Sequence, residues 1–360
     1  MFPKRNIPYF YGFILALFLS SVFSINNLQA QAISSEKLHY AVGADLSFLK
    51  MEEDQGTAFK DSGWVKPGLN IFRSHGYNWI RLRLFHSPDR LPNDLDYTIA
   101  LAKAAKKRGF KFLLDYHYAD SWADPGKQPI PEAWKGLSPD MLVDSVFEYT
   151  KKTISAFREA GVMPQMVQIG NEIRNGMLWP TGKLSDHWDT FARLLKAGID
   201  GVDAGREQAP QPLIMIHNDQ GADVKQCRNF YHKINSYGID YDIIGLSYYP
   251  WWHGSLLELR ENLLSLLNHF DKDIIVVETA YNWQPSEYKN RPEPFPETPE
   301  GQKEFLETLN RTLLNIRSRK IKGVFWWEPA VTGPLGSRSF FDENGNALPV
   351  IHVFDKYTLH

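Results

Sequence analysis

The stretch VQIGNEIRNG, residues Val167 to Gly176, runs an apolar strand directly into an amide and a carboxylate, Asn171 and Glu172. Gly170 precedes this pair and a polar loop follows it, so the chain is expected to turn outward at the glutamate. A glutamate that only stabilises the fold does not require this setting. In α/β barrels the catalytic groups stand at the carboxyl ends of the strands. The stretch therefore predicts a strand end that presents a functional acid.

Seven further apolar runs of strand length lie on either side of this one. The eight predicted strands are His39–Ser47, Asn78–Phe85, Phe110–Tyr118, Met163–Glu172, Pro212–Asn218, Tyr241–Pro250, Asp273–Thr279 and Lys322–Pro329. Segments with apolar residues at helical spacing separate them, namely Leu95–Gly109, Ser138–Gly161, His187–Val202, Leu256–Phe270 and Thr298–Arg317. Nearly continuous apolar strands that alternate with helices predict a parallel sheet covered by helices on both faces.

Eight strands of this kind predict an α/β fold, a single (β/α)8 TIM barrel. The alternative is an open doubly wound sheet, which would need a glycine-rich phosphate-binding turn after an early strand. The segment VGADLSFLK, Val42 to Lys50, does not supply one. The sequence contains no internal repeat and no linker, so we expect one catalytic domain over residues 33–360.

The N-terminus has the features of a secretory signal peptide. Lys4 and Arg5 form a positive region, Tyr9–Phe23 is an uncharged and mostly apolar run, and Ala30–Ala32 reads Ala-Gln-Ala, a typical cleavage site. We expect residues 1–32 to be removed and the protein to be exported to the periplasm or the medium, without a membrane segment. The alternative is a signal anchor that stays in place.

Composition excludes some partners and favours others. The chain has 360 residues, a formal net charge of −2 and a single cysteine, so neither a basic face for nucleic acid nor an internal disulfide is expected. Aromatic residues make up 14% of the chain and include 11 tryptophans. Tryptophan is often placed where a flat apolar face meets a polar partner, and a sugar is such a partner.

Polar and aromatic residues gather at the predicted strand ends and in the loops that follow them. They are Arg81, Arg83, Asp115, His117, Trp122, Asn171, Glu172, His217, Asn218, Asp219, Tyr248, Tyr249, Trp251, Trp252, His253, Glu278, Trp326, Trp327 and Glu328. Each has an ordinary structural interpretation when taken alone, such as an ion pair, a core histidine or, for Glu328, a brace for an arginine. Together they predict one mouth that hydrogen-bonds a sugar or transfers a proton.

Two of these strand ends carry a glutamate, Glu172 and Glu278. Two carboxyl groups are the minimum for cleaving a glycosidic bond, and their environments must push their pKa values apart. Glu172 follows an amide and has aromatic neighbours, which suits the acid. An Arg and a Tyr from neighbouring strands are expected to keep Glu278 ionised. A carbohydrate-binding barrel that has lost catalysis is the alternative from a different class.

Eight motifs, in this order, resemble those of the arabinogalactan endo-β-1,4-galactanases, glycoside hydrolase family 53. They are GADLSFLKMEEDQG, RLRLF, DYHYADSWADPGKQ, QIGNEIRNGMLWP, HNDQGAD, DIIGLSYYPWWHGS, VVETAYNW and FWWEPA. The resemblance covers nearly the whole mature chain. It implies a retaining endo-hydrolase of β-1,4-galactan, the side chain of type I arabinogalactan, that needs no cofactor. We also expect a monomer. The alternative enzyme is a mannanase or xylanase of the same clan.

The resemblance also implies roles for individual residues. Glu172 is expected to be the acid/base, Glu278 the nucleophile, and Asn171 the partner of the substrate 2-hydroxyl at subsite −1. Arg81 is expected to support the nucleophile. The other residues expected to bind substrate are Asp115, His117, Trp122, Tyr248, Trp251, His253 and, as the floor of subsite −1, Trp327. The two carboxyl carbons should lie about 5–5.5 Å apart, the retaining spacing.

One segment near the C-terminus resembles a calcium loop. Some bacterial family members bind calcium near the last strands, and Phe341–Pro349 has Asp342, Asn344 and Asn346 in a turn that contains glycine. The ligand pattern is incomplete. We therefore expect a hairpin turn, and no metal is predicted at the active site.

Overall fold

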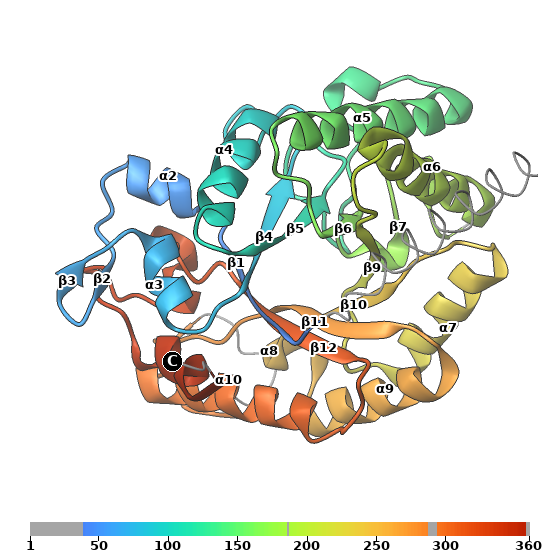
Figure 1. The fold of residues 1–360 in the computed structure, drawn as a ribbon. Coiled ribbons are helices and arrows are strands. Elements are labelled where there is room, and N and C mark those ends of the chain that lie inside the picture. The colour runs from blue at the N-terminus through green and yellow to red at the C-terminus, as the bar shows by residue number, and fades with distance from the viewer. Residues whose placement is uncertain (1–38, 186, 287–293, 358–360) are drawn as a thin grey trace, which may run out of the picture. The chain divides into compact units, whose positions relative to one another are not determined.

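The computed structural model describes residues 39–185, 187–286 and 294–357 (Figure 1). The predicted signal peptide, residues 1–32, lies outside the described residues, as does part of the proline-rich loop that follows the seventh predicted strand. Among the described residues, no helix combines the length and the apolar character needed to cross a bilayer.

Eight strands form a closed barrel, and every neighbouring pair runs parallel. In their order around the barrel they are β1 (Ala41–Asp45), β4 (Trp79–Leu84), β5 (Lys111–Tyr116), β6 (Met166–Ile169), β9 (Leu213–Asn218), β10 (Ile243–Tyr248), β11 (Asp273–Thr279) and β12 (Ile321–Trp327). β12 pairs with β1 and closes the ring. The predicted (β/α)8 barrel is therefore confirmed, and each predicted strand contains, or coincides almost fully with, one of these eight.

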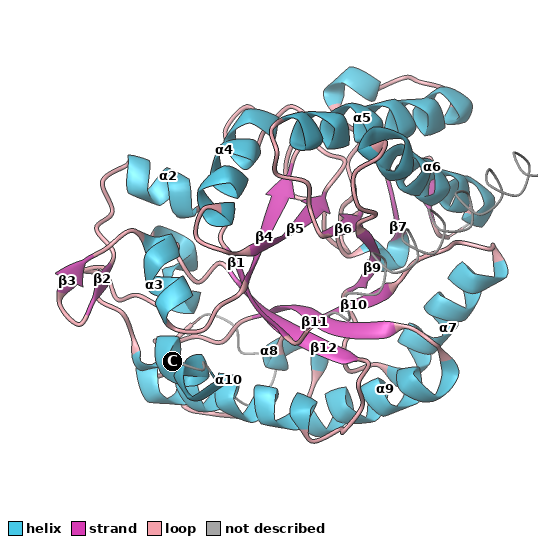
Figure 2. Cartoon of the chain, viewed as in Figure 1, coloured by secondary structure: helices cyan, strands magenta, loops and turns pink. Residues whose placement is uncertain are grey.

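Helices surround the strands on the outside (Figure 2). The larger ones are α3 (Gly68–Ser74), α4 (Leu95–Lys106), α5 (Pro139–Glu159), α6 (Trp188–Arg206), α7 (Val224–Ser236), α9 (Leu256–His269) and α10 (Pro299–Leu314). Several begin at a side chain that accepts a hydrogen bond from the first turn. Ser255, for example, forms a capping box with Glu258 at the start of α9. Such caps satisfy backbone N–H groups that have no partner within the helix.

Short elements decorate the loops. They are α2 (Leu49–Asp54), α8 (Pro250–His253), the 3-10 helices η1 (Glu132–Trp134), η2 (Ile173–Asn175), η3 (Gly333–Arg338) and η4 (Pro349–Tyr357), and the hairpins β2–β3 (Lys60–Asp61, Trp64–Val65) and β7–β8 (Gly176–Met177, Gly182–Lys183). Several of these elements, among them η2, β7, β8, α8 and η3, follow directly on a barrel strand or lie in the loop after it. They therefore shape the mouth where the predicted site lies.

The barrel interior is tightly filled between β1 and β12. Gly43 stands in register with Phe325, and two residues further on Asp45 stands in register with Trp327. A Cβ atom at Gly43 would lie only 2.1 Å from the Phe325 ring. Only glycine fits at this position without a shift of the ring, because real Cβ atoms keep a greater distance from their neighbours.

Candidate active site

A cleft of about 520 Å³ opens at the carboxyl ends of the barrel strands. Eight of the eleven residues predicted to act on the substrate line it: Arg81, His117, Trp122, Asn171, Glu172, His253, Glu278 and Trp327. The sequence prediction therefore located the mouth and most of its walls. Roles for these residues remain proposals and are argued below.

The structure does not place Asp115, Tyr248 and Trp251 among the residues that line the cleft. Asp115 lies completely buried beneath it, where it accepts hydrogen bonds from Arg81 and His117. Tyr248 faces the helices and donates a hydrogen bond to the carbonyl of Gly254. The Trp251 ring is buried against other aromatic rings.

The tyrosine at the site is Tyr249. Side chains alternate along a strand, and Ser247 points into the barrel, so Tyr248 has to point outward and Tyr249 inward. The Tyr249 hydroxyl donates to Glu278 Oε1 over 2.8 Å. The cleft also contains other residues that were not among the predicted substrate contacts, including Asp124, Lys127, Asp219, Gln220, Trp252 and Arg338. Once Ser247 is known to face inward, the alternation of side chains along the strand identifies Tyr249.

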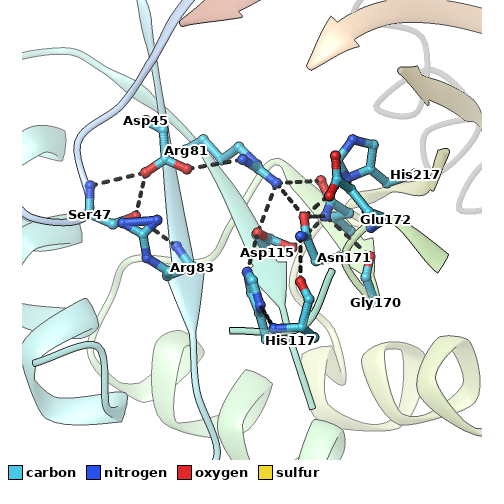
Figure 3. Close-up of polar contacts among 12 residues, drawn as sticks. Asp45, Ser47, Arg81, Arg83, Asp115, His117, Gly170, Asn171, Glu172 and His217 are labelled. Carbon is cyan, nitrogen blue, oxygen red and sulfur yellow. Dashed lines mark hydrogen bonds and ion pairs between the residues drawn. The ribbon is translucent and has the colours of Figure 1, made fainter. Parts of the chain in front are cut away.

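Both carboxyl oxygens of Glu278 accept hydrogen bonds. Arg81 Nη1 donates to its Oε2 atom over 2.8 Å, while Tyr249 holds the other oxygen. Arg81 also contacts Asp45, Asp115 and Asn171 at 3.1, 2.9 and 2.8 Å (Figure 3). These bonds fix the guanidinium, and the guanidinium in turn fixes the orientation of the Glu278 carboxyl group.

Glu172 has a different environment. Its Oε1 atom accepts a hydrogen bond from the Ser247 hydroxyl over 2.6 Å, and His217 Nε2 lies 2.8 Å from the same hydroxyl oxygen. Because the serine donates to Glu172, His217 has to donate to the serine, which assigns a proton to Nε2. A carboxyl oxygen of Glu172 and one of Glu278 lie within 4.8 Å of each other. The distance of about 5–5.5 Å between the two carboxyl carbons stays a prediction.

A family model described as glycosyl hydrolase family 53 matches residues 41–354. The arabinogalactan endo-β-1,4-galactanase of Thermothelomyces thermophilus is 35% identical over 337 residues, which cover 87% of this chain and 98% of the relative. The chain belongs to glycosyl hydrolase family 53.

Solved structures of the family have the same fold. The family 53 catalytic domain of Ignisphaera aggregans superposes with a TM-score of 0.83 at 32% identity and covers 89% of this chain and 97% of its own. A fungal β-1,4-galactanase superposes with a TM-score of 0.82 at 34% identity and covers 89% and 99%. The described barrel is therefore the family 53 fold over nearly its whole length.

Burial and neighbouring charges shift the pKa values of two carboxyl groups of this family 53 site in opposite directions. Burial raises the pKa of Glu172 well above its usual value, and the negative charges of Glu278 and Asp219 raise it further, whereas the Ser247 hydrogen bond lowers it. Burial would also raise the pKa of Asp115, but Arg81 and His117 outweigh burial and hold it at about 2. Glu172, whose pKa is raised, therefore lies close to the ionised side chains of Asp115 and Arg81.

The arginine and the histidine near the pair stay in one charge state. Burial lowers the pKa of Arg81, but the charges of Asp115, Glu278 and Asp45 outweigh it and raise the pKa above its ordinary value. Burial, followed by the charge of Arg81, lowers the pKa of His217 well below its ordinary value. His217 is therefore neutral, in agreement with its role as a single donor to Ser247.

The backbone places Glu172 by leaving the strand abruptly. Gly170 has φ +80° and Glu172 has φ +48° and ψ +53°, a left-handed conformation that is uncommon for a residue with a Cβ atom. β6 therefore stops at Ile169, earlier than predicted. The Asn171 amide between them donates to Ala123 and accepts from Arg81, so its orientation is fixed.

Aromatic rings form the walls of the cleft. The rings of Trp122 and Trp327 lie 6.0 Å apart at 66°, and Trp252 is 42% exposed at the rim. The guanidinium of Arg83 lies 4.4 Å from the Trp122 ring and pairs with Glu328. The prediction that Glu328 braces an arginine is therefore confirmed.

Two groups of metal-ligand type occur among the described residues. His75, His352 and Asp355 form one, but both imidazole Nδ1 atoms already hydrogen-bond to the carboxylate of Asp355. The other consists of Glu172, His217 and Glu278, which are occupied as described above.

The calcium-like segment forms a hairpin turn, as expected. Asp342 accepts hydrogen bonds from the backbone N–H groups of Asn344 and Asn346, and Phe341 bridges to Ala347 in antiparallel fashion. The carboxylate of Asp342 thus stabilises the turn itself.

Proposed function

We propose that this chain is a retaining endo-β-1,4-galactanase that cleaves the β-1,4-galactan of type I arabinogalactan. The observation that carries the proposal is the pair Glu172 and Glu278. Their carboxyl oxygens lie within 4.8 Å of each other, the pKa of Glu172 is raised, and Glu278 accepts a hydrogen bond from Arg81. The printed names of the relatives, which are β-1,4-galactanases, support the choice of galactan.

In the first step Glu278 attacks the anomeric carbon and forms a covalent glycosyl-enzyme. Arg81 and Tyr249 hold its two oxygens, so the attacking oxygen does not have to reorient. Glu172 donates its proton to the leaving glycosidic oxygen at the same time. Its raised pKa keeps that proton available near neutral pH.

In the second step water hydrolyses the glycosyl-enzyme, and Glu172, now ionised, accepts a proton from that water. The charge of Glu278 is neutralised in the covalent intermediate. One of the negative charges that raise the pKa of Glu172 is therefore absent, and Glu172 ionises more readily when it is needed as a base.

The remaining cleft residues orient the sugar. The Asn171 side-chain amide forms hydrogen bonds with Arg81 and Ala123 between the two glutamates. We propose that it binds the 2-hydroxyl of the sugar at subsite −1. Trp327 supplies a flat apolar face for subsite −1, and Trp122 stands against it at an angle. Aromatic faces along an open cleft suit internal attack on a polymer. We further propose that the protein is exported.

The stereochemistry of the product tests the mechanism. NMR of the reaction should show the β-anomer first. Glu278→Ala should lose nearly all activity on any substrate. Glu172→Ala should lose polymer cleavage but retain the first step on a substrate whose leaving group needs no proton, and azide should then give a β-configured product. The roles are wrong if the α-anomer appears first, or if both variants behave alike on activated substrates.

A sugar-release screen over galactan, mannan and xylan tests the substrate. We expect a rapid fall in the mean chain length of galactan, with little free galactose at early times. Cleavage of mannan or xylan in preference to galactan would assign the chain to another activity of the clan. No cleavage of any of the three would favour a binding protein.

A further inference from the structure

A second groove, of about 850 Å³, continues from the catalytic cleft. Pro125 lines both, and an ion pair joins them, because Arg174 in the groove donates to Asp219 in the cleft over 2.9 Å. The other walls come from the β7–β8 hairpin, from the start of α6 and from α7. The groove therefore adjoins the cleft.

The groove lies on the side of the leaving group. Arg174 and Asn175, which line it, follow Glu172 directly along the chain in η2. Because Glu172 protonates the leaving oxygen, the sugars released with that oxygen lie on the Glu172 side of the scissile bond. Whatever occupies the groove thus belongs to the part of the substrate beyond the cleaved bond.

The described residues of the groove carry charge of one sign. Among the residues that the structure describes, its lining includes Arg174, Lys183 and Lys233, and no aspartate or glutamate. Arg174 is neutralised by Asp219, but no salt bridge involves Lys183 or Lys233 within the described part of the chain. The chain as a whole carries a formal net charge of −2, so this local excess of cations does not follow from composition.

Aromatic rings hold both lysines at the groove. The Lys183 ammonium lies 4.5 Å from the centre of the Trp179 ring, and the Lys233 ammonium lies 5.7 Å from that of Trp188. Trp179 is itself fixed, since its indole N–H donates to the carbonyl of Asn175. Cation–π contacts order the ammonium groups without using up their charge, which leaves them available to an anion.

We propose that this groove binds a sugar unit that carries a carboxylate, such as a uronic acid, on the leaving-group side of the galactan chain. Lys183 and Lys233 pair with the carboxylate, and the edges of Trp179 and Trp188 contact the pyranose ring. This inference rests on the proposed galactanase function. It adds that the enzyme prefers galactan attached to, or substituted with, acidic sugars.

The test uses two matched series of β-1,4-galacto-oligosaccharides. In one series the reducing-end unit is galacturonic acid, placed two, three or four sugars beyond the scissile bond, and in the other it is galactose. For at least one position we expect a lower KM for the acidic oligosaccharide, by roughly two- to fivefold per lysine. The ratio of the two KM values should approach one in 0.5 M salt, because salt screens exposed charges.

The double variant Lys183→Gln/Lys233→Gln should bring the ratio of the two KM values to one. Lys103→Gln/Lys107→Gln, which removes the same charge from the exposed surface of α4 and its C-cap, should keep it. Equal KM values for both series at every position, or equal loss of the ratio in both double variants, would overturn the inference. Such a result leaves the galactanase proposal intact, whereas failure to cleave the neutral series would contradict that proposal itself.

Discussion

Ser247 forms a hydrogen bond that affects the pKa of Glu172, the proposed acid/base. Its hydroxyl donates to Glu172, and a bond to the carboxylate favours the ionised form and so lowers the pKa of Glu172. Burial and two negative charges act in the opposite direction. The observed network thus moderates a pKa that burial alone would place higher.

Replacement of this hydroxyl should therefore extend activity to higher pH. Activity requires protonated Glu172 and falls as pH rises through its pKa, so Ser247→Ala, which raises that pKa, should shift the alkaline limb of kcat/KM upward. We expect roughly one pH unit, since a hydrogen bond to a charged group contributes about 1.5–3 kcal/mol. The measurement is the pH profile of kcat/KM on galactan oligosaccharides.

Ser145→Ala, the same change in α5 at a distance from the site, serves as the control and should leave the profile unmoved. A limb that moves to lower pH in Ser247→Ala would show that the serine does not favour the carboxylate, and would contradict this assignment.

The two glutamates could be predicted from the sequence because each ends an apolar run and has no structural need to be there. The prediction chose Tyr248, whereas the hydroxyl at the cleft belongs to the adjacent Tyr249. The choice between these neighbours requires knowing that Ser247 faces inward, which the hydrogen bond from Ser247 to Glu172 shows and the sequence does not. The prediction placed Asp115 in the mouth because the sequence does not show how far below the cleft its side chain lies.

Among the elements, β1 and β12 approach each other through Gly43. Gly43→Ala should lower the free energy of unfolding by about 1–3 kcal/mol, because the new methyl group would overlap the Phe325 ring inside a filled barrel. Urea unfolding followed by tryptophan fluorescence measures this change.

Gly336→Ala is the matched control, since a Cβ atom there has no neighbouring atom within 4 Å. A loss of stability of the same size in both variants would mean that the contact at Gly43 is not the cause.

Long elements with strong patterns could be predicted, and short ones could not. All eight barrel strands and the helices α4, α5, α6, α9 and α10 correspond to predicted segments. The hairpins β2–β3 and β7–β8 have two residues per strand, so tertiary contacts rather than sequence pattern fix them. α7 was not among the predicted helices, although Cys227, Phe230, Tyr231 and Ile234 are buried at helical spacing.

The buried ionic network should make the stability of the whole molecule fall at acid pH. The folded pKa of Asp115 is about 2, below the ordinary value of about 3.9. Its contribution is therefore fully present above pH 4 and is lost as pH falls through the folded pKa. The difference corresponds to about 2–3 kcal/mol.

Urea unfolding between pH 5 and 2 should show this slope in the wild type and a shallower slope in Asp115→Asn. Asp144→Asn, on an exposed position of α5, should retain the wild-type slope. Equal slopes in all three proteins would assign the acid sensitivity to other carboxyl groups.

Export is predicted from the N-terminal residues of the full chain. Lys4, Arg5 and the apolar run before Ala32 predict cleavage close to Ala32. N-terminal sequencing of protein secreted from an expressing bacterium should begin at about residue 33. A secreted or membrane-held form that still begins at Met1 would favour the signal anchor instead.

The left-handed backbone of Glu172 means that catalysis and folding place opposite demands on one residue. A residue with a Cβ atom costs about 1–2 kcal/mol in this conformation, whereas glycine adopts it freely. Glu172→Gly should therefore unfold at a higher urea concentration than Glu172→Ala, the reverse of the usual order of these two residues. If the alanine variant is at least as stable, the conformation is not strained. If the glycine variant is the more stable, the barrel would gain stability from a residue that cannot donate a proton.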